Sequence, residues 1–108
     1  MANTFKNSIT GSIGVSNVIV YTVPAATSTT VIGMSIANVT ANNITISSTL
    51  TSGSNTVYLI KDATVTAGGT TVLVGGDQKV VLTATNYLTV ISSAATSADV
   101  VVSVLEIS

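Results

Sequence analysis

The chain has 108 residues, of which 46% are hydrophobic and only 6% are charged, and its formal net charge is -1. This length fits a single domain. Because His and Cys are absent, the sequence excludes imidazole acid–base catalysis, thiol chemistry and disulfide bonds. Its cations, Lys6, Lys61 and Lys79, are scattered, so it lacks the clustered positive charge that nucleic-acid binding needs.

The first 16 residues are mostly polar, with Phe5, Ile9 and Ile13 spaced among them. Two interpretations fit this pattern. Residues 1–16 form either an N-terminal arm that becomes ordered on a neighbouring subunit or the first strand of the fold. Residues 17–108 are expected to form a β-sandwich domain.

Short segments rich in Val, Ile, Thr and Tyr follow, separated by turn residues about 8–12 positions apart. In chain order the expected strands cover 17–23, 29–39, 44–50, 56–66 with a kink at Asp62, 70–74, 79–83, 87–92 and 98–107. In the second of these, Ile32, Met34 and Ile36 are expected to share one side. This spacing predicts an all-β fold, an antiparallel β-sandwich of about eight strands with jelly-roll or Ig-like topology.

Two glycine pairs, Gly68-Gly69 and Gly75-Gly76, lie between expected strands. Phosphate-binding loops place such glycines before the N-terminus of a helix, whereas strands follow here. Both pairs are therefore expected to form hairpin turns.

Several strands are apolar on both sides. In the last strand, for example, Val100, Val102 and Val104 alternate with Val101 and Leu105. A two-layer sandwich covers only one side of each sheet, so we expect a second copy or another protein to cover the remaining side. The candidate interface residues are the aromatic residues and the apolar residues of the leader: Phe5, Ile9, Ile13, Tyr21, Tyr58 and Tyr87.

The acidic residues Asp62, Asp77, Asp99 and Glu106 are widely separated, and Asp77 is expected to lie in a turn. No motif assigns them a catalytic role, a metal site or a cofactor site, so the chain is expected not to be an enzyme. No apolar run approaches the ~18 residues of a spanning helix, so no membrane partner is expected.

Several stretches together resemble small virion proteins of tailed phages, including marine and cyanobacterial ones. The resemblance covers most of the chain from about Val18 onward. The stretches are Tyr21-Thr-Val-Pro-Ala25, the strand ending Ala37-Asn38, Tyr58-Leu-Ile-Lys-Asp-Ala-Thr-Val65 with Ala67-Gly68, and the terminal Leu105-Glu106-Ile107.

The resemblance implies a capsid decoration (cement) protein that stabilises the head by subunit packing, with no catalytic residues to transfer. The expected partners are further copies of the chain, as a homotrimer, and the major capsid protein or other virion proteins. The expected location is the virion, assembled in the host cytoplasm. Two alternatives stay open: a structural protein of the neck, tail or fibre base, and a β-sandwich module that binds host-surface glycans.

Overall fold

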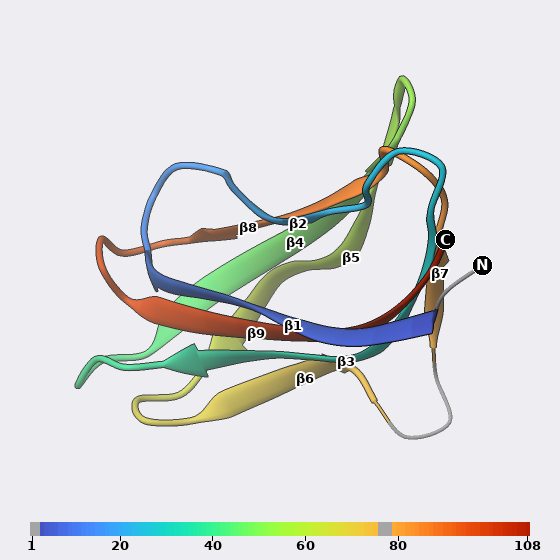
Figure 1. Ribbon diagram of the computed structural model, residues 1–108. Coiled ribbons are helices and arrows are strands. Elements are labelled where there is room, and N and C mark those ends of the chain that lie inside the picture. The colour runs from blue at the N-terminus through green and yellow to red at the C-terminus, as the bar shows by residue number, and fades with distance from the viewer. Residues whose placement is uncertain (1–2, 76–78) are drawn as a thin grey trace.

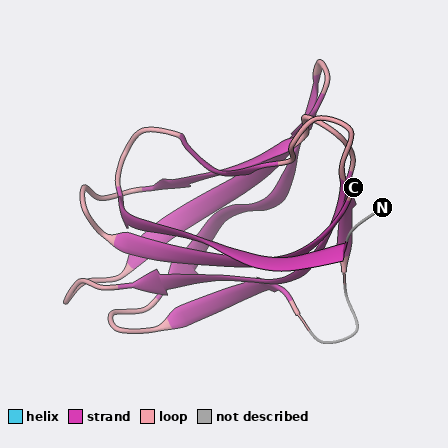
Figure 2. Ribbon diagram, viewed as in Figure 1, coloured by secondary structure: helices cyan, strands magenta, loops and turns pink. Residues whose placement is uncertain are grey.

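The computed structural model describes residues 3–75 and 79–108, which form two packed antiparallel sheets (Figure 1). These residues are strands and loops without a helix (Figure 2), so no helix long and apolar enough to cross a membrane occurs among them. The strands are β1 (Asn3–Ile13), β2 (Val18–Thr22), β3 (Ser28–Asn38), β4 (Ile44–Ser52), β5 (Asn55–Val65), β6 (Thr70–Val74), β7 (Val80–Leu82), β8 (Tyr87–Ser92) and β9 (Ala98–Ile107). The predicted β-sandwich is confirmed.

The strand order within each sheet identifies the topology. One sheet, called here the β1 sheet, has the order β1-β9-β3-β6, with β7 also paired to β3. The other, the β2 sheet, has the order β2-β8-β4-β5. Strands next to each other in sequence mostly lie in opposite sheets, and the first and last strands are neighbours. This is the order of a jelly roll, which distinguishes between the two predicted topologies.

The strands β6 and β7 are two parts of one interrupted strand. Both pair with β3, where β6 lies opposite Met34 to Ala37 and β7 lies opposite Thr29 to Val31. Strands β6 and β7 therefore do not pair with each other as the strands of a hairpin, because both run antiparallel to β3. The turn expected at Gly75-Gly76 includes Gly76, which lies outside the described residues. The turn expected at Asp77 lies outside the described residues.

The glycine pair at Gly68-Gly69 also differs from the expected hairpin. It links β5 to β6, which belong to different sheets. Gly68 has φ +70°, a left-handed conformation that glycine adopts without steric cost. The backbone carbonyl of Gly69 accepts a hydrogen bond from the amide of Asn38, which fixes this crossing to the end of β3.

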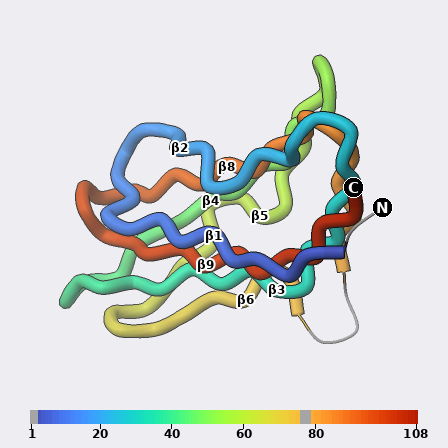
Figure 3. Tube along the Cα trace, in the orientation of Figure 1, coloured from blue at the N-terminus to red at the C-terminus, as the bar shows by residue number. Residues whose placement is uncertain are grey.

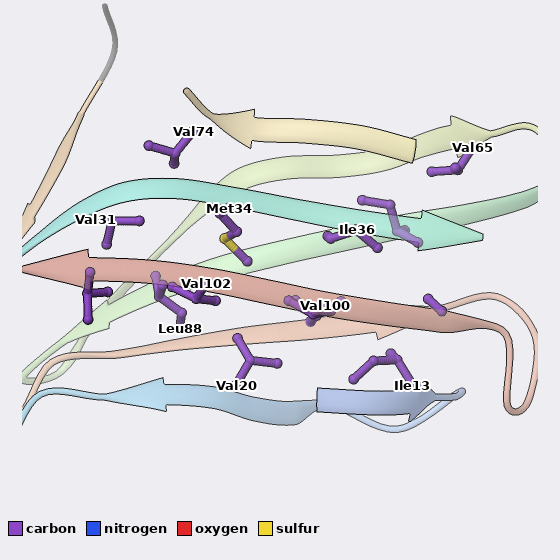
Figure 4. Packing of buried hydrophobic residues seen from close by; sticks show 14 of the residues in the cluster. Ile13, Val20, Val31, Met34, Ile36, Val65, Val74, Leu88, Val100 and Val102 are labelled. Atoms are coloured by element: carbon purple, nitrogen blue, oxygen red, sulfur yellow. The ribbon is translucent and has the colours of Figure 1, made fainter. Parts of the chain in front are cut away.

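The core lies between the sheets and consists of alternate residues from each strand. In Figure 4, Met34, Ile36, Val100 and Val102 of the β1 sheet occupy the same layer as Leu88 of the β2 sheet. All five side chains are fully buried. The two-residue period of β-strands explains why β9 buries every second residue while its other side chains point outward.

One predicted core residue lies elsewhere. The pairing of β3 with β9 shifts between Val31 and Gly33, so Ile32 is the extra residue of a β-bulge. The bulge brings Val31 into the core in its place, and Ile32 is only half-buried. The predicted shared side of Ile32, Met34 and Ile36 is wrong at its first residue because a bulge interrupts the alternation.

Candidate interaction surfaces

The outer side of the β1 sheet carries two rows of side chains that cross it from edge to edge. Along the pairing register one row consists of Ile9, Val101, Ser35 and Val72. The other consists of Phe5, Leu105, Thr30 and Val81. Directly paired residues share a face of the sheet, so each row is continuous. We call the surface formed by Phe5, Ile9, Val72, Val81, Val101 and Leu105 the apolar face.

Strand β1 has the reverse of the usual polarity for a sandwich strand. Its apolar residues Phe5 and Ile9 point outward and are 76% and 73% exposed. Asn7 shares this outer side, whereas Ser8 and Lys6 point toward the interior edge. There the Ser8 hydroxyl donates to the Val20 carbonyl (2.6 Å) and Lys6 pairs with Glu106 (3.1 Å). In the isolated chain these apolar side chains are exposed to water, which makes the outer side of β1 a candidate interface.

The apolar face carries little charge. Within its strands, Asp99 is the one charged side chain of the described residues that points outward, and it lies at the end of the face opposite Ala37. Its carboxylate accepts a hydrogen bond from the Ser12 amide (3.1 Å). The middle of the face therefore has no charge that would have to be desolvated on contact with another protein.

The outer side of the β2 sheet has a different chemistry. One row across it consists of Ile19, Thr89, Thr49 and Tyr58, and the next consists of Thr22, Tyr87, Thr51 and Thr56. The hydroxyls of Thr49 and Thr89 are hydrogen-bonded to each other, and those of Thr51 and Thr56 are 3.0 Å apart. We call this surface the hydroxyl face.

A polar cluster joins the two sheets at one end of the sandwich. The Tyr21 hydroxyl of β2 donates to the Glu106 carboxylate of β9 (2.6 Å), and Thr29 of β3 lies 2.9 Å from the same hydroxyl. Because the Tyr21 proton is directed to Glu106, Thr29 donates to Tyr21. With the Lys6 ion pair, the cluster connects β1, β2, β3 and β9.

The cluster shifts the pKa values of its two acidic groups in opposite directions. The hydrogen bond from Tyr21 lowers the pKa of Glu106 below its ordinary 4.5, and Lys6 adds to this effect while burial opposes it. Burial, followed by the hydrogen bond to Glu106, raises the pKa of Tyr21 to about 12. Both shifts favour a carboxylate paired with a neutral phenol.

The six predicted interface residues lie in four different environments. Phe5 and Ile9 belong to the apolar face, whereas Tyr58 and Tyr87 belong to the hydroxyl face. Tyr21 packs against the core and belongs to the polar cluster. Ile13 is fully buried in the core, because the register of β1 shifts between Thr10 and Ile13. The leader from Asn3 to Ile13 is strand β1, paired with β9 along most of its length (Figure 3).

The apolar face also contains residues that were not singled out from the sequence, namely Val72 and Val81. Their exposure follows from pairing across β3, which no local pattern encodes. Val101 and Leu105 do have a sequence signal, since β9 is apolar on both sides.

Neither face is a pocket, and the described part of the chain encloses none. Over the same residues, no three acidic side chains come together as a possible metal site.

The fold and the two surfaces define the class of protein: a jelly-roll sandwich with one outer face apolar. No family model matches the sequence, and no curated protein matches it. Solved structures do share the fold, at sequence identities too low to show more than that.

One similar structure is a chain of the viral particle of infectious bursal disease virus, with TM-score 0.58 and 11% identity. The alignment covers 96% of this chain but only 30% of the viral one, so this chain spans less than a third of that protein. A chain from the Gx strain of the virus gives TM-score 0.50 and 12% identity, with coverage of 98% and 37%.

Another similar structure comes from the endospore appendages of Bacillus, described as disulfide-linked pili. It has TM-score 0.55 and 10% identity, and the alignment covers 96% of this chain and 86% of that one. The pilus chain is therefore similar in size as well as in fold.

Proposed function

We propose that this chain is a virion structural protein, and within the virion a capsid decoration (cement) protein that stabilises the head by subunit packing. The observation that carries the proposal is the apolar face, which lies on a jelly roll that is otherwise a complete sandwich. Such a role needs contact surface and no catalytic residue. The fold shared with a chain of a viral particle supports the virion setting.

Cementing of this kind works by removing apolar surface from water at the joints between subunits. Burial of apolar surface contributes roughly 25 cal/mol per Å², and a standard interface removes about 1,600 Å² in total. The expected partners are further copies of the chain, as a homotrimer, and the major capsid protein. The expected location is the virion after assembly in the host cytoplasm.

The pilus likeness favours a second candidate, a structural protein of the neck, tail or fibre base. The chain aligned there is similar in length to this one and belongs to an appendage. This chain has no Cys, so a fibre built from it would depend on non-covalent contacts such as those of the apolar face.

Copy number in particles tests both candidates. Particles produced by the genome that encodes this chain would be purified, quantified by mass spectrometry and imaged by cryo-electron microscopy. Decoration predicts hundreds of copies distributed over the shell, whereas a neck, tail or fibre-base protein predicts one ring or a single axial feature. Absence of the chain from purified particles would contradict both.

A further inference from the structure

The strongest unassigned feature is the apolar face, because nothing within the described chain covers it. Its two rows extend from β1 at one edge to β6 and β7 at the other. Each row is apolar at three of its four positions, with Ser35 or Thr30 of β3 as the fourth, and Asn7 and Ser103 lie between the two rows. Isolated exposed valines are common on protein surfaces, whereas apolar side chains gathered on one side of a sheet indicate an interface.

We propose that the apolar face binds the apolar face of a second copy of this chain. This inference deepens the proposed function by naming the surface through which two copies meet, and it rests on the geometry of the sheet. A contact between two identical faces has twofold symmetry, so it differs from the threefold contact of the expected homotrimer. It does not depend on which part of a virion contains the assembly.

The first argument is area. Four strands about 4.8 Å apart and about ten residues long give a face of roughly 650 Å². Two copies in contact would bury about 1,300 Å² in total, which lies within the range of stable specific interfaces. A smaller patch would support only a transient encounter.

The second argument is charge. Among the outward-pointing side chains on the described strands of the face, Asp99 is the single charged one, and it lies at one end of the face. Lys6 and Glu106 belong to the same strands but point to the other side, where they pair with each other. Two identical faces can therefore meet without like-charge repulsion across their centre. A charged partner would find no complementary charge on this face. A second copy, whose face is equally uncharged, needs no such complementarity.

The third argument is the shape of the face. Four of its apolar side chains lie at the flanks, Phe5 and Ile9 on β1 and Val72 and Val81 on β6 and β7. Val101 and Leu105 lie on the inner strand β9, and the other inner strand, β3, contributes the smaller Thr30 and Ser35. A surface of this kind can pack against an offset copy of itself, with a flank of one copy over β3 of the other, as in an isologous interface.

The test is sedimentation analysis of the full chain over a wide concentration range. The wild-type protein is expected to exceed the monomer mass of 10.8 kDa. Ile9→Asp, which places a charge in the contact, is expected to weaken association at least ~100-fold. Val72→Asp is an independent check, because Val72 lies on β6 at the opposite flank of the face. If Ile9→Asp acted only by disturbing strand β1, Val72→Asp would not have the same effect.

The matched control is Ile19→Asp. Ile19 also lies on an edge strand and points outward, but from the hydroxyl face, and it is 56% exposed. It is expected to leave association unchanged, and circular dichroism would verify the fold of all three variants.

Wild-type protein that stays monomeric would overturn the inference. So would an assembly that survives both Ile9→Asp and Val72→Asp, or one that Ile19→Asp weakens equally. These results are separate from the particle assay: a self-associating protein missing from virions would refute the proposed function alone, whereas a monomer present in virions would refute this inference alone.

Discussion

The two outer faces of the sandwich have the same kind of sheet beneath them and yet differ in chemistry. On the hydroxyl face, threonines meet across strands and bond to each other, as Thr49 does with Thr89. On the apolar face, six of the eight positions in the two rows are Val, Ile, Leu or Phe, and the other two are Ser35 and Thr30. A surface whose polar groups are satisfied within the chain is stable in water, whereas one that exposes many apolar side chains is a candidate interface.

The edge strands of the two sheets also differ, in how well they are protected from pairing with other chains. Edge strand β5 of the β2 sheet is bulged at two points of its pairing with β4 and contains Lys61 and Asp62. Edge strand β1 keeps a regular register from Asn3 to Thr10. Bulges and charges protect an edge from pairing with other chains, so β5 is adapted to solvent more than β1 is.

The largest expected effect on stability distinguishes a residue of the core from a residue of the apolar face. Ile36→Ala removes a fully buried side chain and should lower the free energy of unfolding by about 2–5 kcal/mol. Ile9→Ala removes the same atoms from an exposed position and should change monomer stability little, while weakening self-association. Urea denaturation of dilute protein measures the stability. Equal destabilisation by both variants would mean that Ile9 belongs to the core.

The polar cluster is the next test, because it holds β1 beside the rest of the sandwich. Tyr21→Phe leaves the buried Glu106 carboxylate without its hydroxyl donor and should cost about 1.5–3 kcal/mol. Thermal denaturation of the variant beside wild type checks this value. No loss of stability would show that the hydrogen bond is replaced by water.

The same cluster predicts how stability depends on pH. The folded pKa of Glu106 is depressed, so its contribution is present above pH 4.5 and is lost as the pH falls through the lower folded pKa. The folded pKa of Tyr21 is raised to about 12, so its contribution is complete below pH 10 and is lost as the pH rises toward 12. Glu106→Gln should remove the loss of stability at acid pH. If the variant loses stability in acid as the wild type does, another carboxyl group is responsible for that loss.

A smaller effect is expected at the bulged edge. Asp62 has φ +50°, and its amide donates to the Ser47 hydroxyl (2.9 Å). Asp62→Val should cost about 1–2 kcal/mol, because β-branched residues tolerate a left-handed backbone poorly. Asp62→Gly is the control and should be better tolerated. If urea denaturation finds Asp62→Val more stable than Asp62→Gly, the left-handed backbone conformation is not the reason why Asp62 matters.

The smallest expected effect belongs to the hydroxyl face. Tyr58 is 56% exposed, with the Lys61 ammonium 5.2 Å from its ring centre. Tyr58→Ala should change stability by at most about 0.5 kcal/mol and leave self-association intact. Glycan-array binding that this variant abolishes would support the alternative of a sugar-binding module, since exposed aromatic rings stack on sugars.

The sequence predicts the strands well because each is a local pattern of alternating residues between turn formers. All eight expected strands match observed ones within two residues at each end. Ile32 escaped prediction because a bulge in β3 depends on its pairing with β9. The turn at Gly68-Gly69 was misassigned because the partner strand of a turn is a property of the topology.

The apolar face was only partly predictable from the sequence. Phe5 and Ile9 attract attention as apolar residues in a polar leader, and the two-sided pattern of β9 indicates that its outer side needs cover. Ile13 has the same local context, yet a shift of register turns it into the core. Val72 and Val81 join the face only because β6 and β7 follow each other along β3.

The central claim is that the apolar face, and not the hydroxyl face, meets another copy. The most direct measurement is methyl NMR of the wild-type chain with a soluble paramagnetic agent, at low and high protein concentration. We expect the Ile9 methyl to become protected from the agent as concentration rises, while the Ile19 methyl stays accessible. Protection of both methyls, or of neither, would contradict the claim.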